Sequence, residues 1–240
     1  MSIQERHVIA CPACQAELEG QLVDSLNARR HPHLREALLA RRLHVFDCTV
    51  CGHALEVDKP LLYVDFDRFQ FLGCVPGTER RHGRHHAEAL VGAFDRAVRS
   101  GPAELAAQAD RFLVRITFGY EELREKVAID AAGLYDLAVE ALKARLVAAE
   151  PWFQREEVVT LSFDGLEDDG RLRFYPTWLL ARRASVGHTV WAQRRLYDDV
   201  FAEHETLLDQ LPGLASGPHV SLLRLAFDTT APSPQERPAS

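Results

Sequence analysis

Cys11-Pro12-Ala13-Cys14 and, after 33 intervening residues, Cys48-Thr49-Val50-Cys51-Gly52 form the stretch that decides the fold of this chain. Two Cys-x-x-Cys pairs in one short segment are typical of a tetrahedral metal site, with zinc the usual ion and iron the other candidate. Such a turn points both sulfurs at one centre. Pro12 presets the first turn, and Gly52 permits the positive φ that closes a knuckle.

Four thiolates would fill the coordination shell of zinc, so the expected site is structural and not catalytic. The ligands that we predict are Cys11, Cys14, Cys48 and Cys51. The same four cysteines could instead be two redox-active dithiols or unrelated buried residues. The paired spacing favours the metal.

The residues around the two pairs predict a zinc ribbon with a helical insertion. Apolar alternation indicates strands over 16–23, 43–46, 54–57, 61–66 and 69–72. Pro32 suits the first turn of a helix whose apolar stripe is Leu34, Leu38 and Leu39. The inserted helix accounts for a gap longer than that of the simplest ribbons.

The rest of the chain alternates helical and strand patterns, so we expect an α+β protein. Helices are predicted over 87–98, 103–110, 121–127 and 134–146, and a further helix with Leu196, Val200, Leu207 and Leu211 on its inner face. Strands are predicted over 112–118, 158–163, 171–175 and 189–191. We therefore expect a ribbon with its insert over 1–78 and a mixed body of helices and short sheet over 79–228. A disordered tail rich in Pro and Ser is expected over 229–240.

Composition narrows the class of protein. A net charge of −7 and a pI near 5.9 argue against general nucleic-acid binding. The first 60 residues carry seven Lys or Arg against eight Asp or Glu, so the ribbon offers no basic face. No apolar run of membrane-spanning length occurs. Residues 1–6 are polar and the cysteine count of five is odd, which favours a reducing cytoplasm.

Two further features carry weaker hypotheses. The only dense basic cluster, Arg80-Arg81-His82-Gly83-Arg84-His85-His86, is either an anion-binding patch formed by Arg80, Arg81 and Arg84 or a solvated loop that enters a helix. Its histidines could also bind metal adventitiously. The fifth cysteine, Cys74, is expected to be a small buried apolar residue.

The sequence resembles the CpXC family of bacterial and archaeal proteins. The resemblance rests on both cysteine pairs, the insert from Pro32 to Leu43, and the runs Pro60-Leu61-Leu62-Tyr63-Val64-Asp65 and 118–127. One departure is Gln15, at a position where zinc ribbons often carry Gly. The family is defined by its cysteines and functionally uncharacterised, so the resemblance implies a metal site and no particular activity.

Three functions are open at this point. The first is a structural zinc protein that acts through protein–protein contacts, as a regulator or adaptor, and the second is a nucleic-acid-associated ribbon factor. The third is an enzyme with a site in the C-terminal half, built from candidates such as His188, Asp198, Asp199 and His204. The common nucleotide-binding, serine-hydrolase and zinc-protease motifs do not occur, which favours the first.

Overall fold

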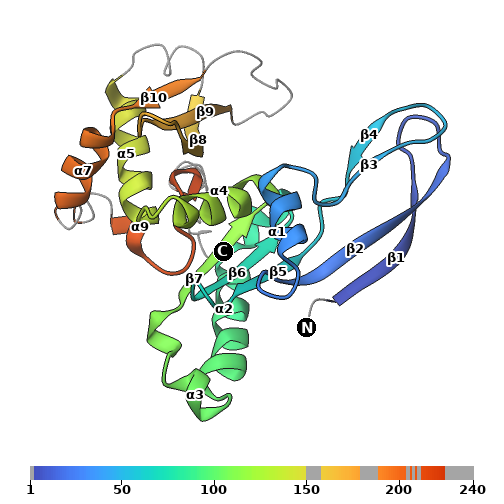
Figure 1. The fold of residues 1–240 in the computed structure, drawn as a ribbon, viewed down its shortest axis with the longest axis horizontal. Coiled ribbons are helices and arrows are strands. Elements are labelled where there is room, and N and C mark those ends of the chain that lie inside the picture. The colour runs from blue at the N-terminus through green and yellow to red at the C-terminus, as the bar shows by residue number, and fades with distance from the viewer. Residues whose placement is uncertain are drawn as a thin grey trace, which may run out of the picture. The chain divides into compact units, whose positions relative to one another are not determined.

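The structure is a computed structural model that describes residues 3–149, 158–178, 189–203, 206, 209 and 212–224. It contains both helices and sheets, which confirms the α+β class (Figure 1). The chain forms two compact units, Met1–Ala131 and Ala132–Ser240. Within the described part, no helix is long and apolar enough to cross a membrane.

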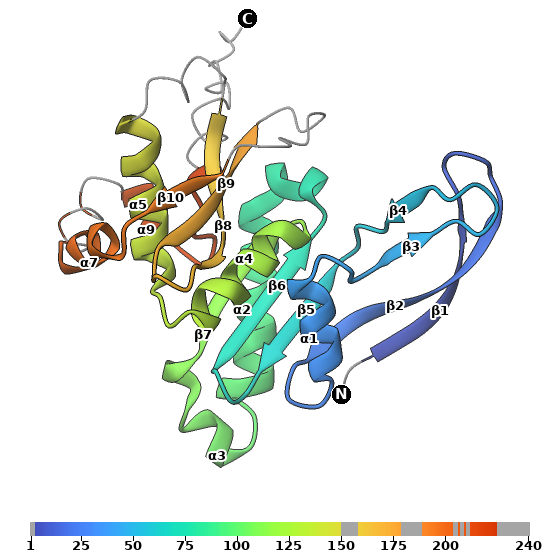
Figure 2. The same cartoon turned by 45° about the horizontal axis from the view of Figure 1, so that its top comes forward.

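The first unit is built on a mixed five-stranded sheet. Its strands are β1 (Ile3–Ala10), β2 (Glu17–Asn27), β5 (Leu61–Asp65), β6 (Gln70–Val75) and β7 (Leu113–Phe118), in the order β1-β2-β5-β6-β7. The pairs β1–β2 and β5–β6 are antiparallel, while β2–β5 and β6–β7 are parallel. A separate hairpin of β3 (Val45–Asp47) and β4 (Ala54–Glu56) accompanies β1 and β2 (Figure 2).

Helices cover both faces of this sheet, because alternate residues of its central strands point to opposite sides. Leu72 on β6 packs with Leu38 and Leu123, while its neighbour Phe71 packs with Leu90 and Phe94. The helices are α1 (Pro32–Leu39), α2 (Gly83–Phe94), α3 (Ala103–Ala106) and α4 (Tyr120–Ala131). Shorter turns are the 3-10 segments Gly77–His82 and Ala109–Arg111 and the π turn Asp95–Arg99.

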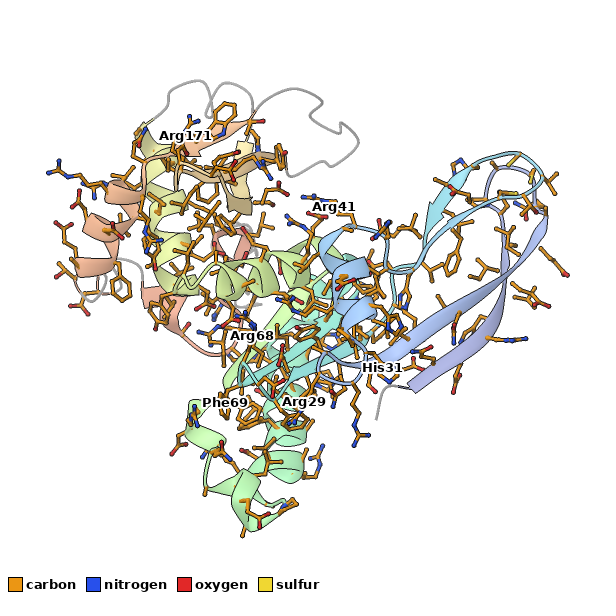
Figure 3. All side chains as sticks on the ribbon, viewed as in Figure 1. Arg29, His31, Arg41, Arg68, Phe69 and Arg171 are labelled. Atoms are coloured by element: carbon orange, nitrogen blue, oxygen red, sulfur yellow. The ribbon has the colours of Figure 1, made fainter. Side chains whose placement is uncertain are left out.

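The turn between β5 and β6 is tied to the end of α4. The Arg68 guanidinium donates to the Asp130 carboxylate over 2.8 Å (Figure 3). The Asp65 carboxylate, at the end of β5, accepts the backbone N–H groups of Asp67 and Arg68 and so shapes the turn itself.

The division of the chain differs from the expected boundary after residue 78. Strand β6 precedes that position and β7 follows it, yet the two pair in parallel over six residues. A parallel pair needs a long crossover, here residues 76–112, which looks like the start of a new domain when only the sequence is read. The inserted helix α1 is also part of the main core of the first unit, because Leu38 is buried beside Tyr63.

The second unit contains a three-stranded antiparallel sheet and helices. The sheet order is β10-β9-β8, formed by β8 (Val158–Leu166), β9 (Leu172–Trp178) and β10 (Val190–Ala192). The helices are α5 (Asp136–Ala149), α7 (Arg194–Ala202) and α9 (Pro212–Ala215). Strands β8 and β9 include the strands predicted over 158–163 and 171–175, apart from Arg171. The expected tail, 229–240, lies outside the described residues.

Candidate metal centre

The four ribbon cysteines meet at one point. The Sγ atoms of Cys11, Cys14, Cys48 and Cys51 all lie within 4.8 Å of one another. The Cys11–Cys51 and Cys14–Cys48 sulfur distances are 3.7 and 3.6 Å. Zinc–sulfur bonds of about 2.3 Å place the sulfurs of a tetrahedron about 3.8 Å apart, so the four side chains fit a metal ion of this kind.

The first knuckle is closed by two backbone hydrogen bonds. The Cys11 N–H donates to the Ala16 carbonyl, and the Gln15 N–H donates to the Cys11 carbonyl, each over 2.8 Å. Gln15 has a φ of 62°, in the left-handed region that usually requires glycine.

The second knuckle repeats this pattern with different residues. The Cys48 N–H donates to the His53 carbonyl over 2.9 Å, and the Gly52 N–H donates to the Cys48 carbonyl over 2.8 Å. Gly52 has a φ of 71°. Gln15 thus takes the backbone conformation of a knuckle glycine, and the departure from the usual ribbon pattern leaves the shape of the turn unchanged.

A small apolar core holds the two hairpins of the ribbon together. Leu18 on β2 and Leu55 on β4 are buried beside Cys11 and Cys48. The ring of Phe46 lies so close to Gly20 that a Cβ at that position would meet it at 2.8 Å. Gly20 therefore lets the β3–β4 hairpin approach β2 and bring the second pair of cysteines to the first.

The pKa values of the Cys14 and Cys48 thiols are shifted in opposite directions. Backbone N–H groups of Cys51 and Val50 donate to the Cys48 sulfur and lower the pKa of its thiol to about 6. The Ala16 N–H lowers the pKa of Cys14, but the adjacent thiols and desolvation raise it to about 12 overall. The lowered pKa of Cys48 favours its thiolate, which is the form of cysteine that binds a metal ion.

The basic cluster is not gathered into one surface. Arg80 lies largely buried, donates to the Glu122 carboxylate over 2.7 Å, and stacks over the Phe118 ring at 5.1 Å. Arg81 and Arg84 are exposed. The structure therefore places the three arginines that we considered as an anion patch in two different environments.

Cys74 and the residues considered for an enzyme site lie in separate environments where the structure describes them. Cys74 is buried on β6, and burial raises the pKa of its thiol to about 12, which fits a small apolar residue. Asp198 accepts from Arg194 one helical turn away over 2.9 Å, and Asp199 is exposed. His188 and His204 lie outside the described residues. The structure does not bring Asp198 or Asp199 into a common pocket with another predicted residue among those it describes.

A buried polar chain at the base of the ribbon was not predicted. His44 Nε2 accepts from the Val23 N–H over 2.8 Å, so its Nδ1–H donates to the Tyr120 hydroxyl over 2.7 Å. That hydroxyl donates to the Lys59 carbonyl over 2.9 Å. Burial, followed by the charge of Lys59, lowers the pKa of His44 to about 4. The partners come from distant parts of the sequence, which offers no local signal for the chain.

Comparisons with known proteins agree with the cysteine geometry. A family model described as CpXC protein matches residues 9–143, which is more than half of the chain and includes all four predicted ligands. Searches of curated proteins and of solved structures found no match.

Proposed function

The chain belongs to the CpXC family, and on this basis we propose that it is a structural zinc protein that acts in the cytoplasm through contacts with other proteins, as a regulator or adaptor. The observation that carries the proposal is the set of four sulfurs within 4.8 Å of one another, two pairs of which are 3.6 and 3.7 Å apart. A tetrahedral ion held by four thiolates has no position left for a substrate or an activated water. The metal therefore serves to hold the ribbon in shape.

The ribbon that the metal would support exposes apolar side chains and a strand edge. Val8 on β1 is 66% exposed, and Val50, between the second pair of cysteines, is 73% exposed. β1 lies at the edge of the five-stranded sheet, where its backbone can pair with an added strand. Exposed apolar residues beside an open strand edge support protein contact as the function.

The proposed zinc site can be tested on untagged full-length protein. Elemental analysis should return one equivalent of zinc per chain, and Cys48→Ser should reduce it to near zero, while Cys74→Ala should leave it unchanged. A content far below one equivalent of zinc in the unmodified chain would overturn the structural zinc site.

The contact is tested by placing a photoreactive amino acid at Val8 or Val50 in full-length protein and irradiating native cell extract. The expected result is one discrete protein adduct at either position, lost when Cys48→Ser is added. Val91, which is 40% exposed on α2, is the matched control and should give no such adduct. Absence of an adduct at both ribbon positions, or the same adduct at Val91, would contradict the proposal.

A further inference from the structure

A second group of metal-ligating side chains lies outside the ribbon, where the 3-10 segment Gly77–His82 runs into α2. Glu79 and His82 are on the 3-10 segment, and His86 is in the first turn of α2. The three residues are spaced by three and four positions, which places them on one side of the helical run. Neither the cysteine pattern nor the proposed function involves them.

The two imidazoles converge on one oxygen atom. His82 Nδ1 lies 3.1 Å from Glu79 Oε2, and His86 Nε2 lies 3.4 Å from the same oxygen. Metal bonds of about 2.0–2.2 Å to His nitrogen and carboxylate oxygen place neighbouring ligand atoms about 3–3.5 Å apart. Two of the three edges of a ligand triangle therefore already have the length that a bound ion requires.

The side chains around Glu79, His82 and His86 favour a defined arrangement of the three ligands. The His86 ring packs edge-on against Phe118, with ring centroids 6.4 Å apart, and its side chain is only 24% exposed. Arg80, which follows Glu79 in the sequence, is engaged by Glu122. Hydrogen bonds from His82, and then from His86, lower the pKa of Glu79, so the carboxylate is already in the anionic form that binds a cation.

From this geometry we propose that Glu79, His82 and His86 form a second metal site, for a divalent first-row transition ion such as zinc. Two imidazoles and one carboxylate suit zinc, nickel or copper better than magnesium or calcium. On binding, each neutral ring changes tautomer: its proton leaves the nitrogen that faces Glu79 Oε2 and its other nitrogen takes one up from water, so the freed lone pair binds the ion. The third edge of the triangle closes by rotation of His82, whose side chain is 52% exposed.

The site differs in kind from the four-sulfur centre. Three protein ligands leave at least one coordination position open for water or another small ligand. Binding is expected to be weaker and exchangeable, because the ligands sit on a half-exposed helical surface and one of them must reorient.

The test uses the full chain with its cysteine site already loaded with zinc, titrated with further Zn²⁺ in a calorimeter. One additional equivalent should bind, and Glu79→Gln, His82→Gln and His86→Gln should each lower its affinity at least about tenfold. The content of the first zinc and the thermal midpoint without added metal should be unchanged in these variants, which separates loss of the site from loss of the fold.

Two variants control for adventitious binding by surface histidines. His85→Gln removes the histidine next to His86, and His33→Gln breaks a second pair, His31 and His33, whose rings lie 5.7 Å apart. Both should bind the additional zinc as the unmodified chain does. The proposal is wrong if no additional equivalent binds, or if either control weakens binding as much as Glu79→Gln does.

Discussion

Gln15 and Gly52 occupy the same position in their knuckles, four residues after Cys11 and Cys48, and both have φ near +60 to +70°. Each N–H donates to the carbonyl of its cysteine over 2.8 Å. A residue with a Cβ is strained in this conformation by about 1–2 kcal/mol, whereas glycine is not. The first knuckle therefore carries a local strain that the second one avoids.

Replacing Gln15 by glycine should stabilise the ribbon. Gln15→Gly should raise the free energy of unfolding of the zinc-loaded chain by about 1 kcal/mol, because the relief of strain exceeds the added flexibility of the unfolded chain. Gly52→Ala should lower it by about 1–2 kcal/mol through backbone strain alone, since a Cβ there meets nothing within 4 Å. Chemical denaturation measures both. Gln15→Ala is the control and should change the free energy of unfolding little. A loss of stability in Gln15→Gly would show that Gln15 is not strained in the first knuckle.

Replacing one of the four cysteines should unfold the ribbon but leave the rest of the first unit folded. Cys11→Ser or Cys48→Ser removes one ligand of the proposed zinc site, and in zinc-finger peptides zinc binding is coupled to folding, with about 10–16 kcal/mol of apparent binding free energy. The helices of the first unit pack in cores that do not contain these cysteines. Circular dichroism should therefore retain most of its helical signal, while amides of β3 and β4 lose protection from hydrogen exchange. Complete loss of the helical signal would show that the body depends on the metal.

His44 should make the stability of the first unit depend on pH. Its folded-state pKa of about 4 lies below the value of about 6.5 for an unfolded histidine. The stabilising contribution of the neutral ring is therefore complete above pH 6.5 and is lost as the pH falls toward 4, because only the unfolded chain binds the proton in that interval. The loss amounts to about 3 kcal/mol at roughly 1.4 kcal/mol per pKa unit.

A comparison with His44→Gln isolates this dependence. The stability difference between the unmodified chain and the variant should shrink by about 3 kcal/mol between pH 7 and pH 4 in urea unfolding. His33→Gln, at an exposed histidine, should leave the pH profile unchanged. A difference that stays constant over this range would show that His44 titrates normally.

The second unit contains a fully buried ion pair on α5. Lys143 donates to Glu140 over 2.8 Å with side-chain exposures of 1% and 0%, and the other Glu140 oxygen accepts the Leu222 N–H over 3.0 Å. Lys143→Met should destabilise the chain by about 3–5 kcal/mol, because it removes a hydrogen-bonded cation from a buried carboxylate. Adding Glu140→Gln should recover much of this loss. Arg194→Met, which breaks an exposed pair with Asp198, should cost at most about 0.5 kcal/mol and serves as the control.

Local features of this protein were predictable, and long-range ones were not. The sulfur cluster follows from two Cys-x-x-Cys spacings, and the β8–β9 hairpin follows from apolar alternation around a polar turn. The inserted helix begins at Pro32 as expected. Each of these signals lies within a few residues, where side-chain periodicity and turn chemistry act directly.

The pairings that assemble the first unit leave no comparable signal. The parallel pairing of β6 and β7 joins segments about 40 residues apart, and the sequence of neither strand indicates which strand it pairs with. Arg80 appeared to belong to a basic surface because its neighbours are cationic, yet its partner Glu122 lies 42 residues away. Tertiary packing determines both contacts, so they are seen only in the folded structure.

Strand β2 pairs with β1 from Glu17 to Ser25 and with β5 from Ser25 to Asn27. One continuous strand thus borders the sulfur cluster at one end and joins the central strands of the sheet at the other. A displacement of the knuckles would be passed along this strand through the irregular pairing between Val23 and Ser25. A partner that displaced the ribbon tip would therefore also perturb the sheet where β2 pairs with Leu62 and Val64 of β5.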